Sequence, residues 1–489
     1  MKCFVTVIIF LLCLGSQSAA QTFEEYKRKE RVNFTGYKYR RQQEFKEYRN
    51  RVNAEFAVYM RRAWSSHRAK PAEPAPQRPE PPRPKVRKPD VKPADNLLQP
   101  GRITVSQTFP VRLSQPAYTP PVLDEELEEE SSFSFLFYGT PCRLPLVEKH
   151  RFVLHGTMED DVADAWQWLS SGDYLSVVAS CLSWRDRLHL CDWGYVCFVE
   201  QMAMEFLAGS RNEARLMQMY ILTQSGYKVR MARVGNRLVL LLPSKDEIYE
   251  YPYLAVKGEK YYIIDPSVHK ETLYLFDREY PEERQLSLLI RTEPLLAESL
   301  SDVRYFSAKH HPEIAVGVSV NRNLMNFYED YPRSNSIAVY VQTPLSRLVK
   351  EQLYPVLRQA VSGKSQAEAA NMLIGFVQTA FSYQTDDVQF GEERAFFPDE
   401  IFFHPNSDCE DRAILYAVLV RDLLGLKTAL LQYPGHVAVA VRFDEDVTGD
   451  YMLIESARYT VCDPTYIGAD IGMAMPQYRQ VVADVFRLE

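Results

Sequence analysis

Near the C-terminus, a helical pattern passes directly into an alternating, valine-rich run. Ser407 or Asp408 suits the N-cap of this helix, and Gly425 suits its end. Apolar residues recur along one face of it, namely Ile414, Leu415, Val418, Leu419 and Leu423. Polar residues are expected on its solvent side, namely Arg412, Arg421 and Asp422. Residues 435–441 then alternate as a β-strand does. We therefore expect a helix packed on a sheet, which is an α+β fold.

Three residues of this region suit a nucleophilic centre. Cys409 falls in the first helical turn, His436 begins the valine-rich strand, and Asp463 follows the next strand. The free N–H groups and positive end of a helix favour a thiolate, and they can also stabilise an oxyanion. His436 would act as the base and Asp463 would orient its ring. Small Ala438 and Ala440, on the face of His436, would let the helix pack closely.

Each of these residues also has a simpler structural explanation. Alone, Cys409 would be a buried small hydrophobe, His436 a core residue, and Asp463-Pro464 a turn. Their order and settings together favour the triad. Cys462 is expected in the core, because it points away from Asp463 and no helix starts there.

These motifs resemble those of the transglutaminase-like superfamily of papain-fold cysteine enzymes. The resemblance covers residues 346–489, and it includes Phe397-Pro398-Asp399-Glu400, which is similar to a segment before the cysteine in bacterial members. It implies a helix bearing Cys409 on an antiparallel sheet that carries His436 and Asp463. The implied activity is thiol acyl transfer on protein or peptide amides, as a cysteine protease or amidase rather than a cross-linking enzyme. No cofactor is expected.

The resemblance also suggests residues around the centre. An oxyanion-hole side chain is often supplied from upstream, and the candidates are Tyr383, Gln384 and Gln389. Exported calcium-dependent proteases of this kind carry an Asp-Cys-Glu run whose carboxylates bind calcium, and Asp408-Cys409-Glu410 matches it. We prefer to explain Asp408 and Glu410 by helix capping and the helix dipole, so no metal is expected.

A degenerate copy of this pattern lies upstream. Asn212-Glu213-Ala214-Arg215 aligns with 409–412, and Asp265-Pro266 aligns with Asp463-Pro464. Asn212 to Asp265 spans 53 positions and Cys409 to Asp463 spans 54, which favours a duplication. The upstream copy has Asn212 in place of the cysteine and no histidine from Arg237 to Leu242. It is expected to be a scaffold or a substrate-holding domain.

Composition divides the chain into six regions. They are a signal peptide (1–20), a charged amphipathic helical segment (21–70), a proline-rich and acidic linker (71–131), the degenerate domain (132–271), a β-rich connector (272–345) and the Cys409 domain (346–489). Within the connector, strands are expected at 273–276, 286–290, 314–320 and 337–341.

The N-terminal regions and the cysteines set further expectations. Lys2, the apolar run 5–14 and Ser18-Ala19-Ala20 predict export, to the periplasm or outside the cell, without a transmembrane segment. The helical segment is expected to pack on its own protein or pair with a copy, although docking on a partner is an alternative. A bridge among Cys181, Cys191 and Cys197 or buried thiols are both open, as is the state of Cys142. The net charge of −7 gives no reason to expect nucleic acid.

A second function class stays open. Both papain-like copies could bind a polypeptide without chemistry, as a non-enzymatic adaptor that reaches a partner through the N-terminal helix and the proline-rich spacer. The missing thiol of the upstream copy makes this reading credible.

Overall fold

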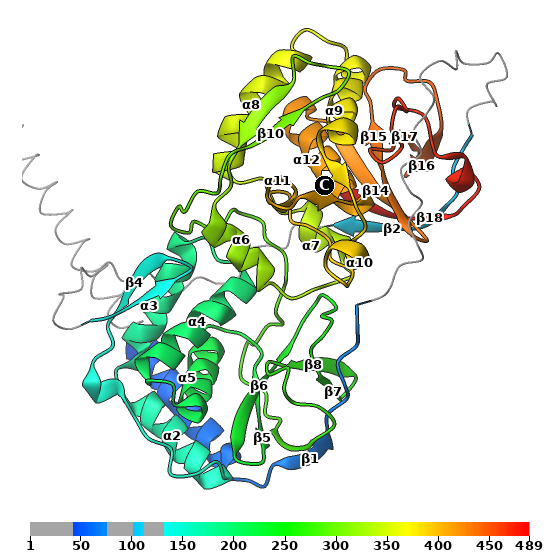
Figure 1. Ribbon diagram of the computed structural model, residues 1–489. Coiled ribbons are helices and arrows are strands. Elements are labelled where there is room, and N and C mark those ends of the chain that lie inside the picture. The colour runs from blue at the N-terminus through cyan, green and yellow to red at the C-terminus, as the bar shows by residue number, and fades with distance from the viewer. Residues whose placement is uncertain (1–42, 76–100, 112–131, 489) are drawn as a thin grey trace, which may run out of the picture.

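The computed structural model describes residues 43–75, 101–111 and 132–488. The expected signal peptide and most of the expected linker lie outside the described residues. Figure 1 shows two lobes, each built from a sheet with helices on it. Both six-stranded sheets are antiparallel except for one edge pair, so the fold is α+β, as expected.

The first lobe combines four helices with a sheet. The helices are α2 (Glu159–Ser171), α3 (Tyr174–Arg187), α4 (Asp192–Phe206) and α5 (Arg211–Gln224). The strands are β1 (Ser65–Arg68), β5 (Arg230–Val234), β6 (Arg237–Pro243), β7 (Tyr253–Val256), β8 (Glu259–Ile263) and β9 (Thr272–Phe276). Their order is β1-β9-β5-β6-β8-β7. A small hairpin, β3 (Phe133–Phe137) and β4 (Thr140–Leu144), and a 3-10 turn, η2 (Glu148–His150), precede the helices.

The second lobe carries the candidate site. Its helical elements are α8 (Arg347–Val361), α9 (Gln366–Ala380), α10 (Asp386–Gln389), α11 (Glu400–Phe403), α12 (Cys409–Leu424) and the 3-10 turn η3 (Pro476–Tyr478). Its sheet contains β2 (Val105–Val111), β14 (Lys427–Tyr433), β15 (His436–Arg442), β16 (Tyr451–Ile454), β17 (Ala457–Cys462) and β18 (Ala483–Leu488). The order is β16-β17-β15-β14-β18-β2. Short β12 (Ser382–Tyr383) and β13 (Asn406–Ser407) pair in parallel beside it.

The two sheets have the same strand order when the strands are taken in chain order after α5 and after α12. In each lobe the helix packs on the two strands that follow it, and a further strand from the N-terminal region closes one edge. This correspondence is what a duplication would produce, and the duplication stays a prediction.

Several predicted boundaries need correction. β9 completes the first sheet, so a boundary at residue 271 cuts through that lobe. β1 lies in the segment expected to be helical, and β2 lies in the region expected to be linker. Both strands cover sheet edges whose backbone groups would otherwise stay unpaired.

The region between the lobes is less strand-rich than predicted. It contains the hairpin β10 (Arg304–Ser307) and β11 (Ala315–Val318) and the helices α6 (Arg322–Glu329) and α7 (Ile337–Val341). The prediction of a strand at 337–341 is wrong, because all five side chains of α7 are buried and such a run carries no periodicity. Residues 286–290 form no strand, and Leu286 makes an isolated bridge to Ser244.

Helix α12 is capped as the sequence predicts. The Asp408 side chain accepts from the Glu410 N–H at 3.2 Å, and Gly425 has a left-handed φ of 68°. The prediction of an exposed Arg412 is wrong, since it is 1% exposed. The helix is covered by α7, α9 and α11 as well as the sheet, so residues 409–420 are all buried.

The helix also packs on the other face of β15 from the one we expected. The valines at 437, 439 and 441 share one core cluster with the helix, whereas Ala438 and Ala440 belong to a separate cluster. The close packing predicted from the two alanines is therefore wrong. Branched valines fill the space between helix and sheet.

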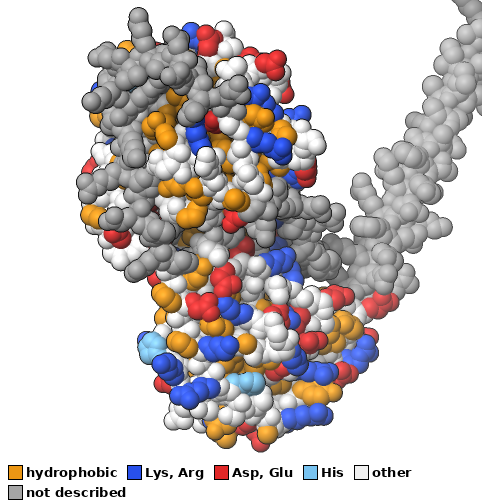
Figure 2. All heavy atoms as spheres, turned by 90° about the vertical axis from the view of Figure 1, so that its right-hand side faces the viewer, with side chains coloured by type: hydrophobic (Ala, Val, Ile, Leu, Met, Phe, Trp, Pro, Cys, Tyr) orange, Lys and Arg blue, Asp and Glu red, His pale blue; other side chains and the backbone are white. Residues whose placement is uncertain are grey.

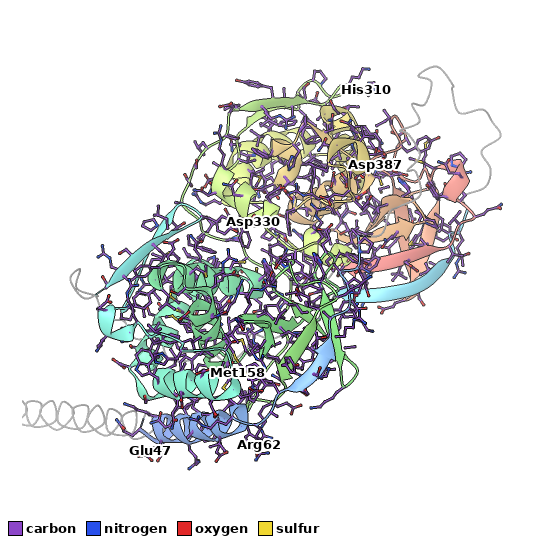
Figure 3. The ribbon with its side chains drawn as sticks, turned by 60° about the horizontal axis from the view of Figure 1, so that its bottom comes forward. Glu47, Arg62, Met158, His310, Asp330 and Asp387 are labelled. Atoms are coloured by element: carbon purple, nitrogen blue, oxygen red, sulfur yellow. The ribbon has the colours of Figure 1, made fainter. Side chains whose placement is uncertain are left out.

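The described part of the N-terminal helix, residues 43–60, lies along α2 (Figure 3). Phe56 is buried against the first lobe, and Arg61 pairs with Asp160 at 3.2 Å. Phe45 and Tyr48 stay 42% and 40% exposed. The C-terminal half of this helix therefore packs on its own protein, which is the simpler of the two expectations.

The described residues give three further results. Positive and negative side chains are interspersed over the face of the first lobe in Figure 2. Within the described ranges, no helix is both long enough and apolar enough to cross a bilayer. No disulfide forms among Cys181, Cys191 and Cys197, which the sequence had left as a possibility. All the described cysteines are free thiols, namely Cys142, Cys181, Cys191, Cys197, Cys409 and Cys462.

Candidate functional site

His436 and Asp463 meet at one end of the second sheet. His436 is the first residue of β15, and Asp463 follows the last residue of β17. Because these strands are antiparallel neighbours, both residues lie at the same end of the sheet. Their side chains are hydrogen-bonded, with His436 Nε2 2.8 Å from Asp463 Oδ2, and they are 1% and 2% exposed. The other carboxylate oxygen accepts the N–H groups of Thr465 and Tyr466 at 2.9 and 3.2 Å. The aspartate is therefore held in place by the turn that follows it.

The remaining imidazole nitrogen has no hydrogen bond. Within the described residues, His436 Nδ1 is buried and lacks a partner. Because Nε2 is committed to Asp463, Nδ1 is the atom left to exchange a proton with a nucleophile. A buried, unpaired nitrogen is costly unless its partner arrives in another state of the site.

Cys409 occupies the first turn of α12, as expected, and is 1% exposed. Its Sγ donates to Glu410 Oε2 at 3.1 Å. Tyr478 contacts both parts of the candidate site. Its ring stacks on His436 with centroids 4.9 Å apart, and its hydroxyl interacts electrostatically with Cys409 and Asp463. The structure thus joins His436 to Asp463 directly and relates Cys409 to them through Tyr478, while the thiol donates its hydrogen bond to a carboxylate.

Of the three upstream candidates for an oxyanion donor, Tyr383 fits best. The pairing of β12 with β13 sets Tyr383 opposite Ser407, two residues before Cys409. Its buried hydroxyl has no hydrogen-bond partner among the described residues. Burial and then the charges of Cys409 and Asp408 raise its pKa far above its usual value, so the hydroxyl stays a donor. Gln384 already accepts from Asn406 at 2.5 Å.

A cluster of carboxylates surrounds the start of α12. Oxygens of Asp386, Glu393, Asp408 and Glu410 lie within 4.8 Å of one another. Burial, followed by the charges of Asp411 and Glu410, raises the pKa of Asp386 to about 10. Burial and Glu410 likewise raise the pKa of Asp408 well above its usual range. The cluster is stable only if it holds protons or a cation, and its oxygen ligands suit a hard cation such as Ca²⁺.

Buried Arg412 lies near this cluster but does not neutralise it by direct pairing. Its guanidinium donates to the carbonyl oxygens of Phe381 and Gln378, at 2.7 and 3.5 Å, and to Ser407 Oγ at 3.3 Å. Burial lowers its pKa to about 10. It ties the helix start to the end of α9 and to β13.

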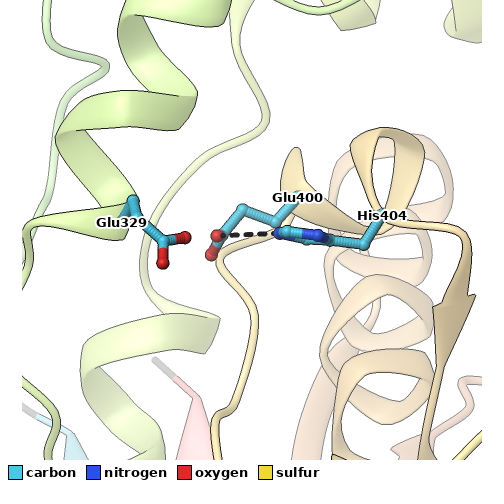
Figure 4. Close-up of side chains that lie close together, drawn as sticks. All are labelled: Glu329, Glu400 and His404. Atoms are coloured by element: carbon cyan, nitrogen blue, oxygen red, sulfur yellow. Dashed lines mark ion pairs between the residues drawn. The ribbon is translucent and has the colours of Figure 1, made fainter. Parts of the chain in front are cut away.

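A second group of ionisable side chains, Glu329, Glu400 and His404, lies where α6 meets α11 (Figure 4). Here a cation is already present, because Arg394 Nη1 is 2.7 Å from Glu329 and Nη2 pairs with Glu400. The other Glu400 oxygen accepts from the Phe397 N–H at 2.9 Å. This group is a structural ion-pair network.

In the first lobe, polar side chains occupy the positions that correspond to the three candidate residues. Arg237 begins β6, the counterpart of β15, and its Nη1 lies 3.1 Å from Asp265 Oδ2. Asn212, in the first turn of α5, accepts from the Leu238 N–H at 2.9 Å. These groups offer neither a thiol nor an imidazole, in agreement with the absence noted in the sequence.

Sequence reasoning missed Tyr478, Asp386, Glu393 and Gln378. Tyr478 follows a proline in a stretch without periodicity, so nothing in its surroundings marked it. Asp386 and Glu393 are brought to α12 by the loop after α9, which no local pattern specifies. Only the excess of acidic residues in 386–393 gave a signal.

Comparison of the chain with protein-family models, with curated proteins and with solved structures gives no match.

Proposed function

We propose that this protein is an exported cysteine enzyme with a transglutaminase-like, papain-type core, which acts on amide bonds of proteins or peptides. The observation that carries the proposal is the buried His436–Asp463 pair at 2.8 Å, which shares the neighbour Tyr478 with a cysteine in the first turn of a helix. A nucleophile, a base and an orienting carboxylate are the parts that thiol acyl transfer needs.

The proposed reaction uses the imidazole of His436, the thiol of Cys409 and the hydrogen-bond donors around them. His436 Nδ1 takes the proton of Cys409, and the thiolate attacks the substrate carbonyl carbon. The N–H groups at the start of α12 and the Tyr383 hydroxyl stabilise the oxyanion. Nδ1–H then gives its proton to the leaving amine as the C–N bond breaks. A water molecule, deprotonated by His436, cleaves the thioester and restores the thiol, so the net reaction is hydrolysis.

The acidic cluster has a part in this proposal. Asp386, Glu393, Asp408 and Glu410 would hold Ca²⁺, which supplies the positive charge that four crowded carboxylates require. Glu410 now accepts the hydrogen bond of the thiol. Engagement of its carboxylate elsewhere would leave Cys409 available to His436.

The experiment is peptide or protein hydrolysis by the full chain and by Cys409→Ala. Loss of turnover with an intact fold supports the proposal, and full activity of the variant overturns it. Cys462→Ala is the matched control, since that thiol is also buried but has no role in the chemistry. Assays with and without added Ca²⁺ test the cluster separately.

The adaptor function remains a second candidate because of one observation. The thiol is bonded to Glu410 and the centre is closed to solvent, which a binding protein would tolerate. Alkylation by iodoacetamide separates the two. Selective modification of Cys409 near neutral pH that is lost in His436→Ala supports the enzyme, and equally slow reaction of all thiols supports the adaptor.

A further inference from the structure

The proposed catalytic centre is covered on the side of the imidazole. The ring of Tyr478 lies nearly parallel to that of His436, with centroids 4.9 Å apart and planes at 16°. It stacks in the same way on Tyr433, at 4.9 Å and 29°. Cys409 and His436 are each only 1% exposed. A polypeptide substrate therefore cannot reach the thiol until part of the cover moves.

The cover belongs to a connection that is longer in the cysteine-bearing lobe than in the first lobe. In the first lobe, β8 and β9 are joined by eight residues, 264–271. The corresponding strands of the second lobe, β17 and β18, are joined by twenty residues, 463–482. The extra length includes η3 and Tyr478. An addition confined to the lobe with the thiol points to a role at that site.

The first half of this connection is fixed to the body of the lobe. Buried Gln378 on α9 donates to the carbonyl oxygens of Asp463, Tyr466 and Ala469, at 3.2, 3.0 and 3.0 Å. Its own amide oxygen accepts from the Gly468 N–H at 3.1 Å. Asp463 can therefore keep its place while later residues move.

The second half is held by the burial of Ala474 and Met475, and beyond them by one carboxylate. Asp450, which is 1% exposed, accepts through Oδ2 from Arg479 Nε and the Ala474 N–H, both at 3.0 Å. Its Oδ1 accepts from the Gly101 N–H at 3.0 Å. Pro476 and Gln477, between these anchors, face solvent. The Asp450–Arg479 pair thus works as a latch for the segment 474–482.

We propose that the segment 474–482 is a cover over the cysteine centre, with Tyr478 as its inner face and the Asp450–Arg479 pair as its latch. The purpose of the cover rests on the proposed function, but its existence does not. In the closed state Tyr478 positions the imidazole of His436 and excludes solvent. When the Asp450–Arg479 pair separates, the residues from η3 onward move away from the site. An extended polypeptide then takes the place of the Tyr478 ring.

The test is the rate of Cys409 alkylation in the full chain, read by peptide mass spectrometry. Two probes are used, iodoacetamide and a bulky iodoacetyl fluorophore. Tyr478→Ala and Arg479→Ala should each raise the rate about 2- to 10-fold for iodoacetamide, the factor that the loss of one such contact produces. The bulky probe should gain more than the small one, because a cover discriminates by size whereas a change in thiol reactivity does not.

The controls keep the outcome clear. Gln477→Ala, at the exposed neighbour of Tyr478, should leave both rates unchanged, and Tyr478→Phe should keep the closed state. Cys462, which is 0% exposed and next to Asp463, reports global unfolding, since it should stay unlabelled in every folded variant. Rates for Cys409 that do not change in Tyr478→Ala and Arg479→Ala, or that rise equally for both probes, would overturn the proposal.

This test is independent of the proposed function. Faster, size-dependent labelling without any hydrolysis would leave the cover standing and remove the enzyme. If Cys409 catalyses hydrolysis but its labelling rates are the same in the variants and the original chain, the enzyme stands and the cover is removed.

Discussion

The single hydrogen bond between His436 and Asp463 decides what the candidate site can do. It fixes the imidazole so that Nδ1 carries the reactive position, and both partners are almost fully buried. A carboxylate in this position keeps the ring in one tautomer and stabilises its protonated form. The unpaired Nδ1 and the thiol bonded to Glu410 indicate a resting arrangement of these same groups.

Asp463→Asn should reduce kcat of the proposed hydrolysis by about 10²–10⁴-fold, the usual contribution of acid–base catalysis. The amide retains the shape of the side chain but cannot stabilise an imidazolium. KM should change little, because Asp463 is buried beneath the ring. Steady-state kinetics with circular dichroism as a check of folding measures this, and an unchanged kcat would exclude the assigned role.

Tyr383→Phe should lower kcat by about 10²–10³-fold, since one oxyanion donor is lost. In the described part of the chain this hydroxyl makes no hydrogen bond, so the fold should be unaffected. Tyr354→Phe is the control, because that hydroxyl donates at 2.7 Å to Asp422, which lies in the last turn of α12, at the opposite end of the helix from Cys409. Equal activity of both variants would assign the oxyanion to the backbone alone.

At the scale of elements, the sequence predicted α12, its cap and the strand after it, because these depend on residues close together in the chain. It could not predict the burial of Arg412, which depends on α9 and α7 covering the helix from outside. It also assigned α7 to a strand, since five buried apolar residues look alike in either structure. Tyr478 reaches His436 only through the path of a long connection, which no local pattern determines.

The carboxylates at the start of α12 predict an unusual dependence of stability on pH. Burial and neighbouring charges raise the pKa of Asp386 to about 10 in the folded protein, whereas an unfolded Asp titrates near about 3.9. Between these values the folded state binds more protons, so the free energy of unfolding falls as pH rises, by up to about 1.4 kcal/mol per pH unit for one such group. The melting temperature should therefore be lower at pH ~8 than at pH ~5.5.

Asp386→Asn should flatten this dependence and raise the melting temperature at the higher pH. The amide oxygen can still accept from the Arg394 N–H, which Asp386 Oδ2 now binds at 2.8 Å. Asp387→Asn, at the exposed neighbour in α10, is the control and should behave like the original chain. Added Ca²⁺ should stabilise the original chain at the higher pH more than it stabilises Asp386→Asn. A variant that is less stable and equally pH-dependent would contradict this account.

At the scale of the whole molecule, the two sheets have the same strand order but carry different side chains at corresponding positions. The first lobe has an Arg237–Asp265 pair where the second has His436–Asp463. The arginine and aspartate side chains are 42% and 26% exposed, whereas the second pair is closed to solvent. An exposed ion pair contributes little to stability. The two pairs therefore differ in both chemistry and burial at corresponding positions of the two sheets.

This difference predicts opposite results for the same substitution in the two lobes. Asp265→Asn should change the free energy of unfolding by less than about 1 kcal/mol, because its ion pair is screened by solvent. It should leave hydrolysis and Cys409 alkylation unchanged. Asp463→Asn should reduce turnover by about 10²–10⁴-fold, since its partner is the proposed base. Urea unfolding and activity, measured side by side on the two variants, test the assignment. If Asp265→Asn impaired turnover as strongly, the first lobe would have to take part in the reaction, and the active and inactive lobes could no longer be told apart by their sites.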